Sequence, residues 1–173
     1  MANRRRNQTN TRPQKPNQQV AQKSSYLVAQ VQKLDSRTFS KEAHQALNDM
    51  ITEFPEVEKN KYYLEKSYHK KASALIQGLT AYISTWGLHR LSGDAQNFLQ
   101  KTSEDTKYKG KVYLKFLESL KSFSKMDFDV DNEGSLIHLP LRQYTALNRL
   151  AIKLAKEWAF WAPSVLGEAE DGQ

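Results

Sequence analysis

Lysines and arginines are the residues of this chain whose spacing suggests chemistry, because they recur at helical steps in three segments. Cations three, four or seven residues apart share one side of a helix, where each can bind a phosphate oxygen. Such contacts hold a polyanion in place without reading its bases. The residues predicted to bind phosphates are Lys66, Lys70, Lys71, Lys107, Lys111, Lys115, Arg142, Arg149 and Lys153. Tyr62, Tyr63 and Tyr113 could stack on bases or pack in the core, and we expect packing.

The sequence lacks motifs for catalysis and for metal binding. Asp127, Asp129 and Asp131 match the first three ligand positions of a helix-flanked calcium loop. Position six is Asn132 instead of glycine, and position twelve is His138 instead of glutamate, so the pattern fails. The 4 histidines have no paired ligand spacing, and no GxxxxGK[ST], GxGxxG or GxSxG motif occurs. We therefore expect no metal, no cofactor and no enzymatic activity.

Positive charge is concentrated in two parts of the chain, which has 173 residues and a formal net charge of +7. The first acidic residue is Asp35, and seven basic residues precede it. Between Lys59 and Lys125 there are 13 basic and 5 acidic residues, whereas the segments 35–58 and 126–173 are both net negative. This distribution predicts a folded body with one positive surface and a positive tail, with a polyanion as partner.

The apolar pattern predicts an all-α fold. Apolar residues recur at steps of three and four, and no segment alternates with the period of two that is typical of strands. A hydrophobic content of 39% is sufficient for one core. We predict a single-domain bundle of five or six helices over residues 21–165. A disordered basic arm at residues 1–20 and an acidic flexible tail at residues 166–173 are expected to flank it.

Four helices are expected in the first two thirds of the chain. One covers about residues 22–33, and the next runs from an N-cap at Ser40 to a stop at Pro55. The central segment, from about Lys59 to Leu91, has an apolar side and a lysine side, and its long run ends at Gly87. A further helix covers residues 88–101.

Two more helices are expected nearer the carboxyl terminus. After a polar turn at residues 102–106, a helix carries Lys107, Lys111 and Lys115 on one side. An acidic loop follows at residues 124–139. The last helix is predicted to start near Pro140, to place Arg142, Arg149, Lys153 and Lys156 opposite its apolar side, and to end at Pro163.

The sequence contains no signal for membrane insertion or secretion. The longest run without charge, residues 72–89, contains five serine, threonine or glutamine residues and continues an amphipathic pattern. We interpret it as a buried helix. The first 20 residues contain no apolar core of a signal peptide. Together with the absence of cysteine, this favours a cytoplasmic location and no membrane contact.

Two segments resemble a known family. Tyr68 to Gln77, continued to Trp86-Gly87-Leu88, resembles a long helix that closes on an asparagine-Gly-Leu turn. Residues 144–162 resemble a closing helix, and the matching residues are Tyr144, Arg149, Ala151, Ile152, Leu154, Trp158, Trp161 and Ala162. The family is the small all-helical subunit of type III CRISPR RNA-guided effector complexes, of the Cmr type (type III-B). This sequence departs from the family at Trp86, where a polar residue is usual, and at Ala159-Phe160, which replace a basic pair.

The resemblance implies a non-catalytic, RNA-binding subunit in antiviral defence. Such subunits associate with one another in a short filament beside the backbone subunits. They line the channel where guide RNA pairs with a single-stranded target RNA, and they bridge to the large signalling subunit. The predicted cations would then contact the phosphates of guide and target RNA.

Two other functions remain open from the sequence. A helical DNA-binding or nucleoid-type protein would use Gly87 as a turn and residues 88–101 as a reading helix, with Arg90, Gln96, Asn97, Gln100 and Lys101 toward DNA. A scaffold that docks an acidic partner protein would need only the positive surface. Binding to RNA or to duplex DNA and its dependence on salt would separate these functions.

Overall fold

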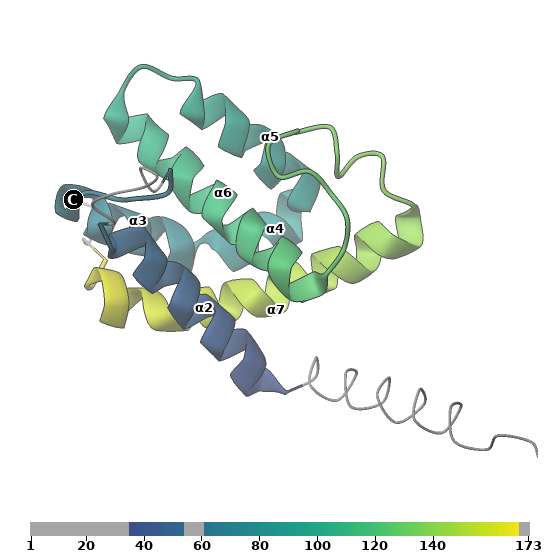
Figure 1. Cartoon of the computed structure of the whole chain (residues 1–173), viewed down its shortest axis with the longest axis horizontal. Coiled ribbons are helices and arrows are strands. Elements are labelled where there is room, and N and C mark those ends of the chain that lie inside the picture. Colours follow the sequence, from purple (N-terminus) through teal and green to yellow (C-terminus); the bar gives the residue numbers. More distant parts are fainter. Residues whose placement is uncertain (1–34, 54–60, 170–173) are drawn as a thin grey trace, which may run out of the picture. The chain divides into compact units, whose positions relative to one another are not determined.

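The computed structural model describes residues 35–53 and 61–169, and within these ranges it contains six α-helices and no strand. The helices, shown in Figure 1, are α2 (Ser36–Ile51), α3 (His69–Gln77), α4 (Leu79–Trp86), α5 (Leu88–Leu99), α6 (Glu104–Ser124) and α7 (Leu141–Leu166). A 3₁₀ turn, η1 (Lys66–Tyr68), precedes α3. The predicted all-α fold is therefore confirmed. The arm predicted at residues 1–20 and the helix predicted at residues 22–33 lie outside the described residues.

Contacts divide the chain into residues 1–35 and residues 36–173, and all six helices belong to the second unit. In that unit α7 packs along α2, α3 and α4, while α5 and α6 form the other close pair. The chain passes from the end of α6 through residues 125–140, which run beside α5 before α7 begins (Figure 1). The side chain of Gln96 in α5 ties this loop down by donating to Val130 O at 3.2 Å. Helix α7 thus contacts four of the other five described helices, and so does α6.

The core contains an aromatic contact between α6 and α7. Phe116 and Trp158 are both fully buried, and their rings meet edge to face with centroids 5.3 Å apart. Burying one side chain of this size contributes about 1.5–3 kcal/mol, and the edge-to-face geometry adds about 1 kcal/mol. The same core holds other side chains that are fully buried: Leu47, Met50, Leu64, Ile76, Leu79, Ile83, Leu88, Leu91, Leu117 and Leu120.

The joint between α4 and α5 depends on Gly87. This residue has φ +81° and ψ 162°, a conformation that is essentially restricted to glycine. A Cβ atom at Gly87 would lie 2.7 Å from the hydroxyl oxygen of Tyr144. The next residue is also tied to α7, because Leu88 N donates to Asn148 Oδ1 at 3.0 Å. The predicted helix end at Gly87 is confirmed. The α4–α5 joint packs against α7 at this residue.

The predicted central helix is interrupted, which corrects the sequence interpretation of residues 59–91. Residues 61–65 are not helical, because Leu64 N donates to Met50 O at 2.8 Å and the stretch packs against the end of α2. A second break falls at Gly78, between α3 and α4. Glycine has low helix propensity, so a break is least costly there. Residues 59 and 60 lie outside the described ranges.

Helices α2 and α6 both begin earlier than predicted. Helix α2 starts at Ser36, so Ser40 is inside the helix and is not its N-cap. The hydroxyl of Ser40 donates instead to Glu157 of α7. Helix α6 starts at Glu104, within the predicted turn, because acidic residues in a first turn are stabilised by the helix dipole. Helix α2 ends at Ile51, and Pro55 lies outside the described residues.

Helix α7 also continues beyond the proline that was predicted to end it. The helix passes Pro163 and ends at Leu166, and Gly167 N donates to Pro163 O at 3.0 Å. Proline removes one backbone donor, but Ala162 and Leu166 are 0% and 4% exposed. Burial of these two side chains against the bundle offsets the lost hydrogen bond.

Alanine substitution should have opposite effects at two glycines. Gly87→Ala places a Cβ against Tyr144 at positive φ, so we expect the free energy of unfolding to fall by about 2 kcal/mol. Gly93→Ala lies inside α5 with no atom within 4 Å of the added Cβ, so we expect a gain of about 0.5–1 kcal/mol. Urea unfolding monitored by circular dichroism measures both. Equal effects would contradict the described joint.

Alkaline pH should destabilise the bundle partly through Tyr113. Burial, and to a smaller extent the charge of Asp94, raises the pKa of this phenol from 10.0 to about 12. The folded chain holds the proton more tightly than the unfolded chain, so this contribution is complete below pH 10 and is lost toward pH 12. Tyr113→Phe should reduce the fall in unfolding free energy over this range by up to about 1.4 kcal/mol per pH unit. Urea unfolding at several pH values gives the free energy of unfolding of Tyr113→Phe and of the parent chain. An equal dependence on pH for both would contradict this assignment.

Candidate nucleic-acid interface

The outer face of α7 presents a row of cations to solvent. Arg142, Arg149, Lys153 and Lys156 are all exposed. Their spacing of seven, four and three residues returns each side chain to the same side of the helix. The opposite side is buried, and its residues are Leu147, Ala151, Leu154, Ala155, Trp158, Ala162 and Leu166. Burial of the inner face therefore directs all four cations away from the bundle. We call these four residues the α7 row.

The α7 row is long, and no described acidic side chain forms an ion pair with it. At 1.5 Å rise per residue, Arg142 and Lys156 are about 21 Å apart along the helix axis. In the part of the chain that the structure describes, none of the four has an ion-pair partner. Glu157, which follows Lys156, accepts a hydrogen bond from Ser40 of α2 instead. The row can thus bind anions from solution.

The predicted lysine row on α6 is used within the bundle. Lys107 pairs with Glu104 at 2.8 Å, and Lys111 Nζ donates to Tyr63 O at 3.2 Å. Lys115 pairs with Asp49 of α2 at 3.0 Å, and its side chain is only 14% exposed. Each cation of this row therefore has a partner inside the chain, which leaves it less available to an external phosphate.

The three lysines predicted near the start of α3 divide into one paired and two exposed cations. Lys71 pairs with Asp105 at 2.9 Å, and this hydrogen bond raises the pKa of Lys71. Lys66 and Lys70 are exposed, and no ion pair joins them to another described residue. The stem of Lys70 lies beside the end of α7, because a Cβ at Gly167 would be 3.7 Å from Lys70 Cγ. The negative end of the α7 dipole stabilises a cation at this position.

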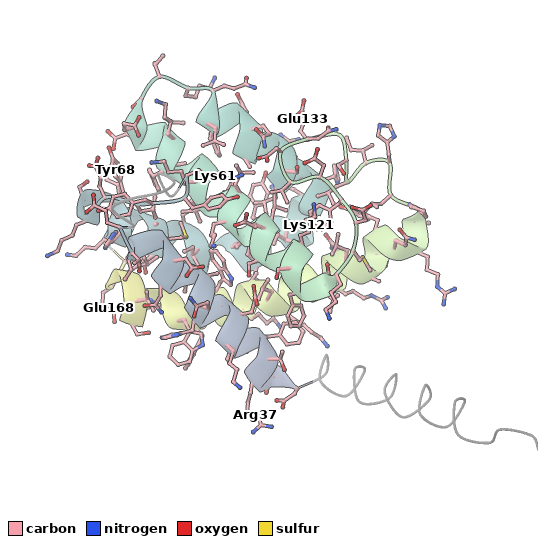
Figure 2. The ribbon with its side chains drawn as sticks, in the orientation of Figure 1. Arg37, Lys61, Tyr68, Lys121, Glu133 and Glu168 are labelled. Atoms are coloured by element: carbon pink, nitrogen blue, oxygen red, sulfur yellow. The ribbon has the colours of Figure 1, made fainter. Side chains whose placement is uncertain are left out.

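These lysines lie far from the start of the α7 row. Figure 2 shows Tyr68 and Glu168 at the same end of the bundle, where α7 stops. Arg142 is in the first turn of α7, so most of the length of this 26-residue helix separates it from Lys70. Of the nine predicted residues, five are therefore exposed without an ionic partner among the described residues: Lys66, Lys70, Arg142, Arg149 and Lys153.

Sequence reasoning did not select an aromatic group at the carboxyl end of the α7 row. Phe160 is 69% exposed and lies four residues beyond Lys156. Its ring meets Trp161 edge to face with centroids 5.1 Å apart, and Trp161 meets His44 of α2 at 4.9 Å. Helical periodicity could have identified Phe160, since it is 18 residues after Arg142 and therefore five full turns along the same face.

The tyrosines and the acidic loop have structural roles in this chain. Tyr62 and Tyr113 are 6% and 5% exposed, which confirms packing, and Tyr62 donates to Glu118 at 2.9 Å. In the loop, Asp131 N donates to Asp129 Oδ1 at 3.0 Å, and Asp131 pairs with Lys61. Among residues 35–53 and 61–169, no three His, Asp or Glu side chains gather as a metal site would require.

Helix α5 is the reading helix of the DNA-binding alternative, and several of its side chains already make contacts within the bundle. Its inner residues Leu88, Leu91, Ser92 and Ala95 are buried. Of its polar residues, Gln96 already donates to Val130 O, and Arg90 lies over the ring of Trp86 at 5.2 Å. Asn97 and Gln100 remain exposed. This helix therefore offers few side chains for reading base edges.

Comparisons with models of known protein families, with curated proteins and with solved structures give no significant match to this chain. In the described ranges, no helix is both long enough and apolar enough to cross a membrane. The fold and the exposed cations define the class: an all-α protein whose longest helix packs a core on one side and presents the α7 row on the other.

Replacing lysine by methionine should separate the two kinds of cation. Lys115→Met removes a cation that is only 14% exposed and that pairs with Asp49, so we expect the free energy of unfolding to fall by about 1–2 kcal/mol. Lys153→Met removes an exposed cation and should change stability by less than about 0.5 kcal/mol. Chemical denaturation measures the free energy of unfolding of both variants. Combining each variant with Asp49→Asn tests whether that lysine interacts with Asp49. Equal losses for both lysines would contradict the different roles.

Proposed function

We propose that this chain is a non-catalytic protein that binds RNA phosphates through the outer face of α7. The observation that carries this proposal is the α7 row, four exposed cations on one side of one helix without ionic partners among the described residues. Phosphate contacts of this kind position a strand and do not read its sequence. Lys66 and Lys70 are further exposed cations, and Lys70 lies beside the carboxyl end of α7.

The assembly that we propose is a type III CRISPR RNA-guided effector complex, in which this chain is the small subunit. The proposal rests on the resemblance of residues 68–88 and 144–162 to that family. It is supported by the glycine joint at Gly87 and by the position of Arg149, on the outer face of the closing helix. In this role copies associate in a short filament beside the backbone subunits, in the cytoplasm of a prokaryote, and contact the large signalling subunit.

The division of labour in such a complex fits a phosphate-binding surface. Base pairing between guide RNA and target RNA reads the sequence, so the protein needs only contacts to the backbone. A row of cations on a rigid helix provides such contacts at fixed spacing, because the buried inner face prevents the helix from rotating. The same surface would suit guide-paired RNA of any sequence.

Binding of RNA should depend on the α7 row and on salt. The parent chain is titrated against a single-stranded RNA of about 20 nucleotides, at salt concentrations from about 50 to about 200 mM. We expect Arg149→Gln combined with Lys153→Gln to weaken binding about tenfold or more at the lower salt. Loss of two phosphate contacts should also reduce the slope of log affinity against log salt by about 1.4.

The control for this experiment removes the same charge elsewhere. Lys101 and Lys125 are exposed and lie outside the α7 row, so Lys101→Gln combined with Lys125→Gln should change affinity less than about threefold. Equal effects of the two double variants would overturn the assigned surface. Preference for duplex DNA would favour the DNA-binding alternative, and salt-insensitive binding to an acidic protein would favour the scaffold.

The assembly is tested by what co-purifies with a tagged copy of the chain from its native host. A guide RNA of uniform length and several larger proteins are expected. The variant Arg149→Gln with Lys153→Gln should retain the protein partners and recover less RNA. Recovery of the chain with heterogeneous DNA, or without larger proteins, would overturn the proposed complex.

A further inference from the structure

Among the exposed apolar side chains, Phe160 alone continues the α7 row within the described part of the chain. The others are Trp86, Ile137 and Leu141. Trp86 already has Arg90 over its ring, and Ile137 and Leu141 border an apolar cleft of about 360 Å³ with Tyr144. Tyr144 belongs to the buried side of α7, because its hydroxyl contacts the α4–α5 joint. The cleft and the α7 row therefore face different directions.

From this placement we propose that Phe160 is a stacking platform for an unpaired base of the RNA strand held by the α7 row. This inference rests on the proposed function, because it assumes that the row binds phosphates. Phe160 lies one turn beyond Lys156, at about 6 Å along the helix axis. A strand bound to Lys153 and Lys156 would therefore bring a base close to the ring.

The surroundings of Phe160 favour such a role. Phe160 is 69% exposed at the end of a row of cations. Covering an exposed phenyl ring with a base removes apolar surface from water, which is favourable. Trp161 holds the ring from one side by an edge-to-face contact, and Trp161 is itself packed against His44 of α2. The ring is thus partly oriented before a ligand binds, which reduces the entropy that binding would otherwise cost.

The chemistry selects single-stranded RNA over a duplex. Bases in a duplex stack on one another, so their faces are not accessible to a side chain. Bases in a single strand can leave the stack and bind an aromatic ring, largely independently of sequence. The cations alone would bind both forms through phosphates. A preference for unpaired RNA would therefore come from Phe160, while the α7 row supplies the salt-dependent part of the affinity.

Three RNA probes separate stacking from phosphate binding. They are a single strand of about 20 nucleotides, the same strand in a duplex, and a strand of equal length whose central nucleotides lack bases. Phe160→Leu keeps an apolar side chain and removes the aromatic ring. We expect Phe160→Leu to weaken single-strand binding roughly tenfold and to leave binding of the duplex and the abasic strand unchanged. Phe160→Trp should retain the affinity of the parent chain for the single strand.

The control is an exposed aromatic residue outside the row, and Trp86→Leu should leave binding of all three probes unchanged. Equal weakening of all three probes by Phe160→Leu, or no weakening at all, would overturn the stacking proposal. In that case salt-dependent binding that still requires Arg149 and Lys153 would leave the proposed function standing. If the parent chain bound none of the three probes, both proposals would be overturned.

Photo-crosslinking of a 5-iodouridine strand should mark the peptide that contains Phe160, and a crosslink only at Trp86 would contradict the assignment.

Discussion

Burial of the inner face of α7 is the constraint on which the candidate interface depends. Trp158 is fully buried against Phe116 of α6, and Ala151 and Leu154 on the same side are fully buried as well. Rotating the helix would expose this face and bury charged side chains, which costs several kcal/mol. The rotation of α7 is therefore fixed, and residues at the opposite positions must face solvent. The α7 row is a consequence of how the core packs.

The same reasoning explains why the cations of α6 have a different role. Helix α6 has buried residues on most of its circumference, among them Tyr108, Val112, Leu114, Phe116 and Leu117. A lysine on such a helix emerges between neighbouring elements, where a charge without a partner is costly. Lys115 therefore reaches Asp49 of α2, and Lys111 reaches a backbone carbonyl of residue 63. A helix that is buried over most of its circumference uses its cations within the fold, whereas a helix with one open side presents them to partners.

Sequence periodicity was sufficient for the fold class and for most helices, because it reports which side of each helix is apolar. It predicted the outer face of α7 and the joint at Gly87 correctly. It could not predict the partners of Lys115 or of Ser40, which lie 66 and 117 residues away in sequence. It also placed the end of α7 at Pro163, since local propensity does not include the burial of Leu166. Contacts between distant residues decided each of these points.

A single row of four cations also limits how tightly one copy of the chain can hold RNA. Each phosphate contact in a single strand releases less than one counterion, so a few contacts give modest affinity at physiological salt. Copies arranged along one strand would bind it together, because after the first copy binds the others meet the RNA at high effective concentration. A weak, sequence-independent surface is then an advantage for the proposed subunit, since no single copy fixes the register of the strand. Base pairing can set the register first, and the row of cations on each copy follows the backbone.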